Sequence, residues 1–135
     1  MRIMAIDYGD ARTGIAVSDL MNTMTGDAFV ITQWNPESIA EIITDEAKKR
    51  DVGTLVLGLP KNMDGTMGPR AEKSLALAEL LKEKSGLPVI MWDERRTTVD
   101  AHRILSDNGK KMKKHKTNVD AVAASLILEG YLASL

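Results

Sequence analysis

Three acidic residues have the positions and side chains best suited to chemistry in this chain. Asp7 closes the apolar run "RIMAI" at 2–6, and Glu94 follows the run "LPVIMW" at 87–92. Asp120 falls in the first turn of an expected helix. Open α/β sheets bind their ligands at the edge where the carboxyl ends of parallel strands meet. We therefore expect these three carboxylates to converge at one such edge.

A cluster of carboxylates needs a cation because like charges repel. The chain has no cysteine and only two histidines, His102 and His115, so an all-oxygen site is expected. Oxygen ligands suit hard divalent cations, here Mg²⁺ or Mn²⁺. Two such ions about 4 Å apart can activate a water and stabilise the leaving oxygen of a phosphodiester. The pattern predicts that Asp7, Glu94 and Asp120 are both the metal ligands and the catalytic residues of a two-metal hydrolase.

Each acid also has a purely structural explanation when taken alone. Asp7 could begin a hairpin turn, and Glu94 could pair with Arg95 or Arg96 on the surface. The sequence "TNVD" at 117–120 fits a capping box, and an acid in the first turn of a helix suits the helix dipole. The prediction therefore depends on the three acids together.

Basic and amide side chains near the acids could contact a nucleic-acid backbone. The segment "GLPKNMDGTMGPR" at 58–70 is either a turn-rich connection or a functional loop, and long loops of this kind often carry function. The segment "KKMKKHK" at 110–116 holds five lysines and is either a solvated loop or a phosphate-binding one. The residues predicted to bind nucleic acid are Arg12, Lys61, Asn62, Arg70, Arg95, Lys110, Lys111, Lys113, Lys114 and Lys116.

Two further acids, Asp93 and Asp19, could assist the site, and the aromatic residues bear on how bases would be bound. The sequence leaves open whether Asp93 or Asp19 assists the three acids, although Asp19 suits a turn at the end of a strand. The chain has two Trp, two Tyr and one Phe, so base stacking is not expected to dominate binding.

The elements that must position these residues form an α/β pattern. Apolar runs and turn signals predict strands at 2–6, 13–18, 28–34, 53–60 and 87–92. The order predicts a mixed five-stranded sheet whose first three strands are antiparallel neighbours, with helices on both faces. The last helix is expected to turn Val119, Val122, Ala123, Leu126 and Ile127 inward. Helices are predicted from Asn35 as cap to Ala47 and at 69–86, 97–109 and 117–135.

Length and composition limit the classes of protein to which this chain can belong. The 135 residues fit one domain, 1–135, and a formal net charge of −1 excludes a uniformly basic coat for nucleic acid. The lack of cysteine fits a reducing compartment. No stretch resembles a signal peptide or a membrane span. We expect a cytoplasmic protein without a membrane partner, as a monomer or a weak dimer.

Four motifs in order resemble the YqgF family, also called RuvX: "IDYGDARTGIAVSD", "VLGLPKNMDGTMGPR", "WDERRTT" and "VDAVAASLILEGYL". These bacterial proteins have a ribonuclease H-like fold and are described as candidate Holliday junction resolvases and as candidate pre-16S rRNA nucleases. The resemblance spans nearly the whole chain and implies that Asp7, Glu94 and Asp120 form the acidic triad. It also implies trimming of the 5′ end of precursor 16S ribosomal RNA, with ribosomal precursor particles as partners. Arg96 departs mildly from the family pattern, which often has an apolar residue there.

Several functions remain open at this point. The first is a metal-dependent nuclease acting on structured RNA, and a close rival is a nuclease that resolves branched DNA junctions as a dimer. A non-catalytic RNA-binding module for ribosome assembly would have little need of clustered acids. The segment "DYGDARTG" also resembles the phosphate-binding hairpin of actin-like and hexokinase-like proteins. Those proteins clamp a nucleotide between two lobes, and this chain is long enough for one.

Overall fold

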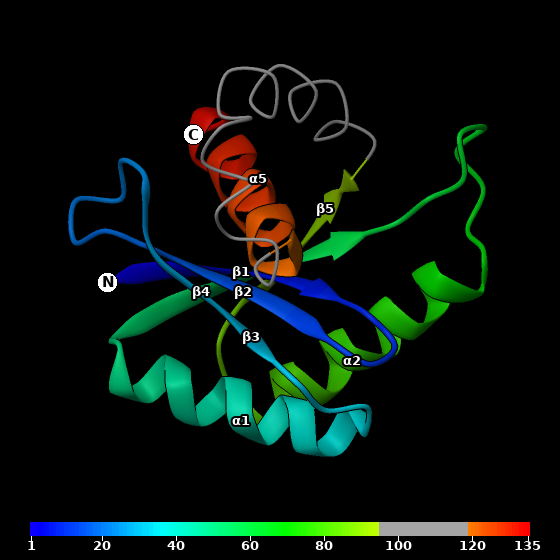
Figure 1. The fold of residues 1–135 in the computed structure, drawn as a ribbon, viewed down its shortest axis with the longest axis horizontal. Helices are drawn as coiled ribbons and strands as arrows, with labels where there is room; N and C mark the ends of the chain where they lie inside the picture. Colours follow the sequence, from blue (N-terminus) through cyan, green and yellow to red (C-terminus); the bar gives the residue numbers. More distant parts are fainter. Residues whose placement is uncertain (95–118) are drawn as a thin grey trace.

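One mixed five-stranded sheet in the order β3-β2-β1-β4-β5 organises the molecule (Figure 1). The computed structural model describes residues 1–94 and 119–135, and at residues 119 and 120 the backbone alone. None of the helices in these described ranges is long and apolar enough to cross a membrane. The strands are β1 (Arg2–Tyr8), β2 (Thr13–Ser18), β3 (Thr25–Ile31), β4 (Val52–Leu59) and β5 (Val89–Asp93), and the helices are α1 (Pro36–Lys49), α2 (Pro69–Ser85) and α5 (Val119–Ala133).

The strand directions confirm the expected topology. β1 pairs antiparallel with β2, which pairs antiparallel with β3. β4 lies parallel to β1, and β5 lies parallel to β4. The hairpin from β1 to β2 is tight at Gly9, where an added Cβ would lie 2.4 Å from the carbonyl oxygen of Arg12. The carboxyl ends of β1, β4 and β5 therefore meet at one edge of the sheet, immediately beside this hairpin.

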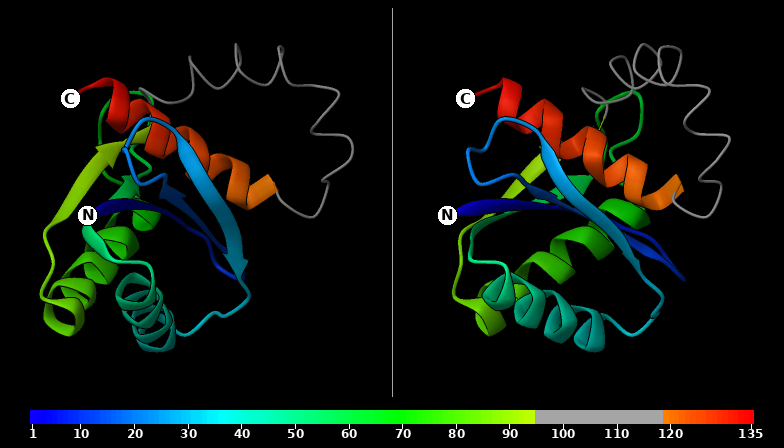
Figure 2. Two further views of the ribbon diagram at one scale, coloured as in Figure 1. Left: turned by 90° about the vertical axis from the view of Figure 1, so that its left-hand side faces the viewer. Right: turned by 60° about the vertical axis from the view of Figure 1, so that its left-hand side comes forward.

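Helices cover both faces of the sheet, as expected (Figure 2). α1 and α2 bury one face around Met4 and Ile6 of β1. α5 covers the other face, where Ala5 of β1 and Ala16 of β2 pack in one cluster with Ala124. Successive side chains of a strand point to opposite faces. Asp7 therefore lies on the face that α5 covers.

The first helix forms where local chemistry favours it. The Asn35 side chain accepts hydrogen bonds from the backbone N–H groups of Glu37 and Ser38. Pro36 takes a position where a missing N–H costs nothing, and Glu37 suits the positive end of the helix dipole. The predicted cap is therefore confirmed.

Two expectations about individual elements were wrong. The third strand is Thr25–Ile31 rather than 28–34. Its pairing with β2 begins at Ser18 and Thr25. Beyond the strand, the Gln33 side chain accepts hydrogen bonds from the backbone N–H groups of Trp34 and Asn35, and the chain turns toward α1.

The inner face of α5 also differs from the expected set. Val122 and Ala123 are half-buried, and the buried residues are Ala121, Ala124, Leu126, Ile127 and Leu128. Small residues let the helix lie close against Ala5 and Ala16 of the sheet. The helix predicted at 97–109 lies outside the described residues.

Candidate active site

Two of the three predicted acids meet at the carboxyl edge of the sheet. Asp7 is the penultimate residue of β1, paired with Gly14 of β2, and is half-buried. Glu94 follows β5 directly and is also half-buried. The carboxyl groups of Asp7 and Glu94 are hydrogen-bonded to each other. Residues far apart in the sequence thus bring two carboxyl groups into contact.

The contact changes the protonation of Glu94. Burial, followed by the negative charge of Asp7 and the hydrogen bond to it, raises the pKa of Glu94 to about 8. The positive charge of Arg70 opposes this shift, and the charge of Asp93 adds to it. At neutral pH the two carboxyl groups therefore hold a proton between them, because two adjacent anions cannot both be desolvated at low cost.

Gly58 of β4 makes the space for this pair. A Cβ added at Gly58 would lie 2.4 Å from Oε1 of Glu94 and 2.8 Å from Cδ1 of Ile127 in α5. The Glu94 carboxyl group therefore lies over the backbone of β4, under α5. A glycine within an apolar strand often marks such a close approach, which is the signal in "VLGLP" that could have predicted it.

The donor set fits a hard divalent cation. Asp7 and Glu94 both offer carboxylate oxygens, which hard divalent cations prefer. The proton that the two groups share lies between them, at a position where a positive charge is favoured. Within residues 1–94 and 121–135, no three acidic or histidine side chains form a group that could hold a metal ion. A complete triad would need the third acid, Asp120.

Asp120 is the second residue of α5, and its side chain lies outside the described part. α5 begins on the side of the molecule where β1 ends (Figure 2). The backbone is thus compatible with the predicted triad, and the convergence of all three side chains stays a prediction.

The predicted nucleic-acid contacts within the described residues lie on segments that border this edge. Arg70 is exposed in the first turn of α2, close enough for its charge to act on Glu94. Arg12 is exposed in the hairpin, and Lys61 is half-buried where β4 leaves the sheet. Asn62 is exposed, and its side-chain amide donates to Thr66 within its own loop. Outside the described residues lie Arg95, Lys110, Lys111, Lys113, Lys114 and Lys116.

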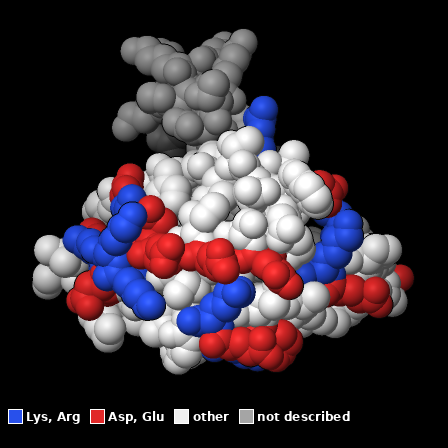
Figure 3. Space-filling view, turned by 90° about the horizontal axis from the view of Figure 1, so that it is seen from below, with Lys and Arg blue, Asp and Glu red and all other residues white. Residues whose placement is uncertain are grey.

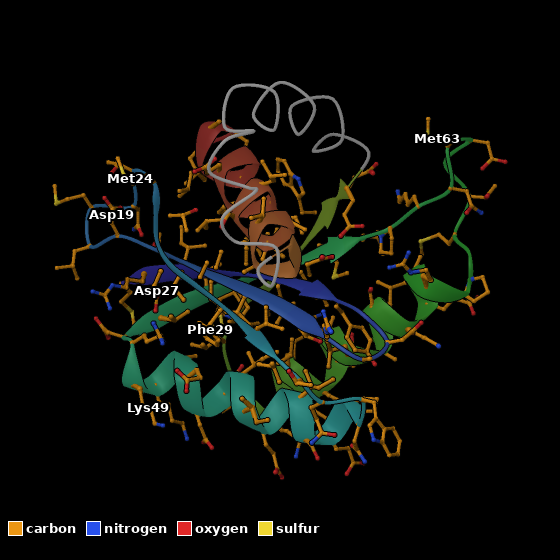
Figure 4. The ribbon with its side chains drawn as sticks, in the orientation of Figure 1. Asp19, Met24, Asp27, Phe29, Lys49 and Met63 are labelled. Atoms are coloured by element: carbon orange, nitrogen blue, oxygen red, sulfur yellow. The ribbon has the colours of Figure 1, made fainter. Side chains whose placement is uncertain are left out.

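Asp19 has a structural role at the other end of β2. It accepts hydrogen bonds from the side-chain hydroxyl and backbone N–H of Thr23, which hold the pKa of Asp19 below its ordinary value. Figure 4 shows Asp19 in the β2–β3 turn, across the molecule from the β4–α2 loop that carries Met63. Asp19 is therefore a turn residue, whereas Asp93 lies close enough to affect Glu94.

The face formed by α1 has a different charge pattern from that expected for phosphate binding. Seen from below, it shows a row of acidic side chains between separate basic ones (Figure 3). The exposed acids of α1 include Glu37, Glu41 and Asp45. A polyanion would be repelled by this row, so the carboxyl edge of the sheet is the better candidate for nucleic acid.

Comparison with known proteins gives a consistent family match. The RuvX family, described as "Holliday junction resolvase", matches residues 1–134. A protein of Halothermothrix orenii named "Putative pre-16S rRNA nuclease" is 45% identical over 132 residues, covering 98% of this chain and 94% of the relative. A Clostridium acetobutylicum protein of the same name is 42% identical over 135 residues and covers 100% of both chains.

Solved structures share the fold at low sequence identity. RuvC of T. thermophilus in complex with a Holliday junction superposes with a TM-score of 0.64 at 11% identity, covering 99% of this chain and 96% of that one. The fowlpox virus Holliday junction resolvase gives 0.61 at 16% identity and covers 100% of both chains. The ROK hexokinase of Thermus thermophilus gives 0.51 at 19% identity, with 72% of this chain matched to 36% of the hexokinase. The expected ribonuclease H-like fold is confirmed.

Proposed function

This chain belongs to the RuvX family, and from that membership we propose that it is a metal-dependent nuclease that hydrolyses phosphodiester bonds in precursor 16S ribosomal RNA. The single observation that carries the proposal is the hydrogen-bonded pair of Asp7 and Glu94 at the carboxyl edge of the sheet. Such a half-buried acidic pair is costly for folding unless a cation replaces the shared proton.

Asp7 and Glu94, joined by Asp120, would hold Mg²⁺ or Mn²⁺. A divalent cation bound there lowers the pKa of a water molecule and offsets negative charge on the reacting phosphate. Gly58 lets the Glu94 carboxyl group lie beside Asp7. Pairing with Gly14 of β2 would position Asp7 before substrate arrives, and ligands already in position need little reorganisation during the reaction.

Basic residues around the edge would position the substrate. Arg70 and Arg12 are exposed there, and each guanidinium can hold two phosphate oxygens at once. Contacts of this kind bind RNA without reading its sequence and weaken as salt is added. Arg95 and the lysines of 110–116 would extend the same phosphate-binding surface.

RNA is favoured over branched DNA because relatives that match 94% or more of their own length carry the rRNA nuclease name. The rival is a junction-resolving DNA nuclease, favoured by the family description and by the junction-bound RuvC that shares the fold. Both nucleases would hydrolyse a phosphodiester bond in the same way, so the substrate that is cut distinguishes one from the other.

The test is cleavage by the pure protein with Mg²⁺, with Mn²⁺ or with EDTA. The substrates are the 5′ end of precursor 16S rRNA and a four-way DNA junction, and the cuts are mapped on each. We expect cation-dependent cuts in the RNA that Asp7→Asn, Glu94→Gln and Asp120→Asn each abolish. Asp19→Asn is the matched control, since it also removes one acidic charge but lies at the far end of β2.

Three outcomes would contradict the proposal. Symmetric cuts in the junction alone would favour the resolvase. Cleavage that survives in all three variants would remove the acids from catalysis. RNA binding without any cleavage would favour a non-catalytic assembly module. A sugar kinase or ATPase is the remaining alternative, because a hexokinase shares the fold over 72% of this chain. A rise in melting temperature with ATP would favour that alternative.

A further inference from the structure

The two tryptophans of this chain have opposite environments. Trp92 is buried in the sheet, with an exposed fraction of 7%, and packs edge-on against Tyr131. Trp34 has an exposed fraction of 73% in the short connection between β3 and α1. An exposed indole offers a large flat apolar surface with a polar N–H, which a planar ligand could cover.

Local hydrogen bonds constrain the backbone at Trp34. Its backbone N–H donates to the side chain of Gln33, and the following residue, Asn35, caps α1. Pro36 then restricts the chain at the first helical position. The backbone that carries the indole is therefore constrained on both sides, which limits the backbone entropy that a ligand would have to offset.

Trp34 forms one wall of a hollow beside the carboxyl edge of the sheet. The hollow has a volume of about 390 Å³. Its walls combine aromatic, aliphatic and charged groups from the β1–β2 hairpin, the β3–α1 connection and α2. The residues that line it are Tyr8, Asp10, Trp34, Pro36, Lys73 and Ala76.

The chemistry of these walls fits a nucleotide. Tyr8 and Trp34 offer aromatic surface for a planar base, and Pro36 and Ala76 keep the walls apolar. At the rim, Nζ of Lys73 lies 3.6 Å from Oδ1 of Asp10, and both side chains are largely exposed. Because this ion pair is exposed, Lys73 could exchange Asp10 for a phosphate at the mouth of the hollow.

The hollow and the acidic pair both lie at the carboxyl end of β1, on opposite faces of the sheet. Tyr8 follows Asp7 directly, and the two side chains point to opposite faces of the sheet. Tyr8 packs toward the α1 and α2 face, while Asp7 contacts Glu94 on the α5 face. A polynucleotide crossing the end of β1 could hence place one phosphate at the acids and a neighbouring base in the hollow.

We propose that the hollow between Tyr8 and Trp34 binds an unpaired nucleobase of the substrate, stacked on the Trp34 indole. The site would hold a single-stranded stretch beside the cleaved bond without selecting its sequence, since every base has a face that can stack. The inference rests on the proposed function for the identity of the ligand. It adds a site that the acids and phosphate contacts do not supply.

The test uses tryptophan fluorescence of the full chain in EDTA, where no cleavage is expected. The probes are a short single-stranded oligoadenylate and an abasic oligonucleotide of the same length, which has the phosphates but no bases. The emission of Trp34→Phe, which comes from buried Trp92 alone, supplies the baseline. We expect oligoadenylate to quench the Trp34 emission and the abasic oligonucleotide to leave it unchanged.

Variants provide a second readout. Trp34→Leu should weaken oligoadenylate binding roughly 5- to 150-fold, the range measured for loss of one stacked base. Ala76→Gln keeps the indole but fills the hollow from an exposed position of α2, and should weaken binding too. Lys73→Gln should weaken binding of both probes, because it removes the positive charge beside Asp10 and leaves the aromatic surface unchanged. Thermal unfolding confirms that each variant is folded.

Three results would overturn the inference. These are equal quenching by the abasic probe, unchanged oligoadenylate affinity in both Trp34→Leu and Ala76→Gln, and quenching by free glucose at similar concentration. Failure of the proposed function would look different. In that case the wild-type chain with Mg²⁺ or Mn²⁺ would cut no RNA, whereas the fluorescence result in EDTA would be unaffected.

Discussion

Replacing Gly58 by alanine should damage cleavage far more than folding. The added Cβ would lie 2.4 Å from Oε1 of Glu94, whereas ordinary contact begins at 3.4 Å. The Glu94 carboxyl group must therefore move by about 1 Å, away from the position where it meets Asp7. A misplacement of that size can lower a catalytic rate about 100-fold.

The cost in stability should be smaller. The atoms that the new methyl group would meet are the far ends of two flexible side chains, Glu94 and Ile127. Overpacking a core typically costs about 1–3 kcal/mol, and movable neighbours place this variant at the low end, about 1 kcal/mol. Urea unfolding measures this cost, and single-turnover cleavage of the RNA measures the rate.

Gly53→Ala is the matched control for this experiment. Gly53 lies in the same strand, and a Cβ there would also meet a flexible side chain closely, that of Met1 at 2.9 Å. It is at the opposite end of β4 from the acids. We expect Gly53→Ala to cleave at the wild-type rate. If Gly58→Ala is folded and cleaves as fast as Gly53→Ala, the placement of Glu94 over Gly58 does not matter for catalysis.

Three further predictions concern pH, a turn and a cap. Without divalent cations, the melting temperature should fall as pH rises from about 4.5 to about 8, because Glu94 keeps its proton in the folded chain after the unfolded chain has lost it; Glu94→Gln should flatten this dependence. Asp19→Ala should lower the melting temperature by removing the hydrogen bonds from Thr23, yet leave RNA cleavage unchanged; loss of cleavage would give Asp19 a catalytic part. Asn35→Ala should cost about 1 kcal/mol in urea unfolding through the lost cap of α1, and an unchanged midpoint would contradict the capping role.

Much of the framework could be predicted because local signals agreed with the global fold. The turn at Gly9, the apolar runs of β4 and β5 and the cap at Asn35 each indicated their element correctly. Parallel pairing of β1, β4 and β5 then predicted where Asp7 and Glu94 would meet. The position of the edge followed from topology and needed no side-chain detail.

What sequence patterns could not predict depends on tertiary contacts. β3 includes Gly26 and Asp27, which strands usually avoid, because pairing with β2 outweighs local preference. The apolar residues of α5 extend around the helix, so the buried set was decided by the close approach of Ala124 to the sheet. The hollow beside Trp34 joins three segments that are distant in the sequence, and only the fold brings them together.

The most direct test of the central claim is titration of the pure protein with Mn²⁺ by calorimetry at pH 7. The measurement is made in two buffers that differ in ionisation heat, so that proton release is also obtained. The cation should take the place of the proton shared by Asp7 and Glu94. We predict binding with release of about one proton, lost or strongly weakened in Asp7→Asn and in Glu94→Gln. Absence of binding, or equal binding by wild type and both variants, would contradict the account.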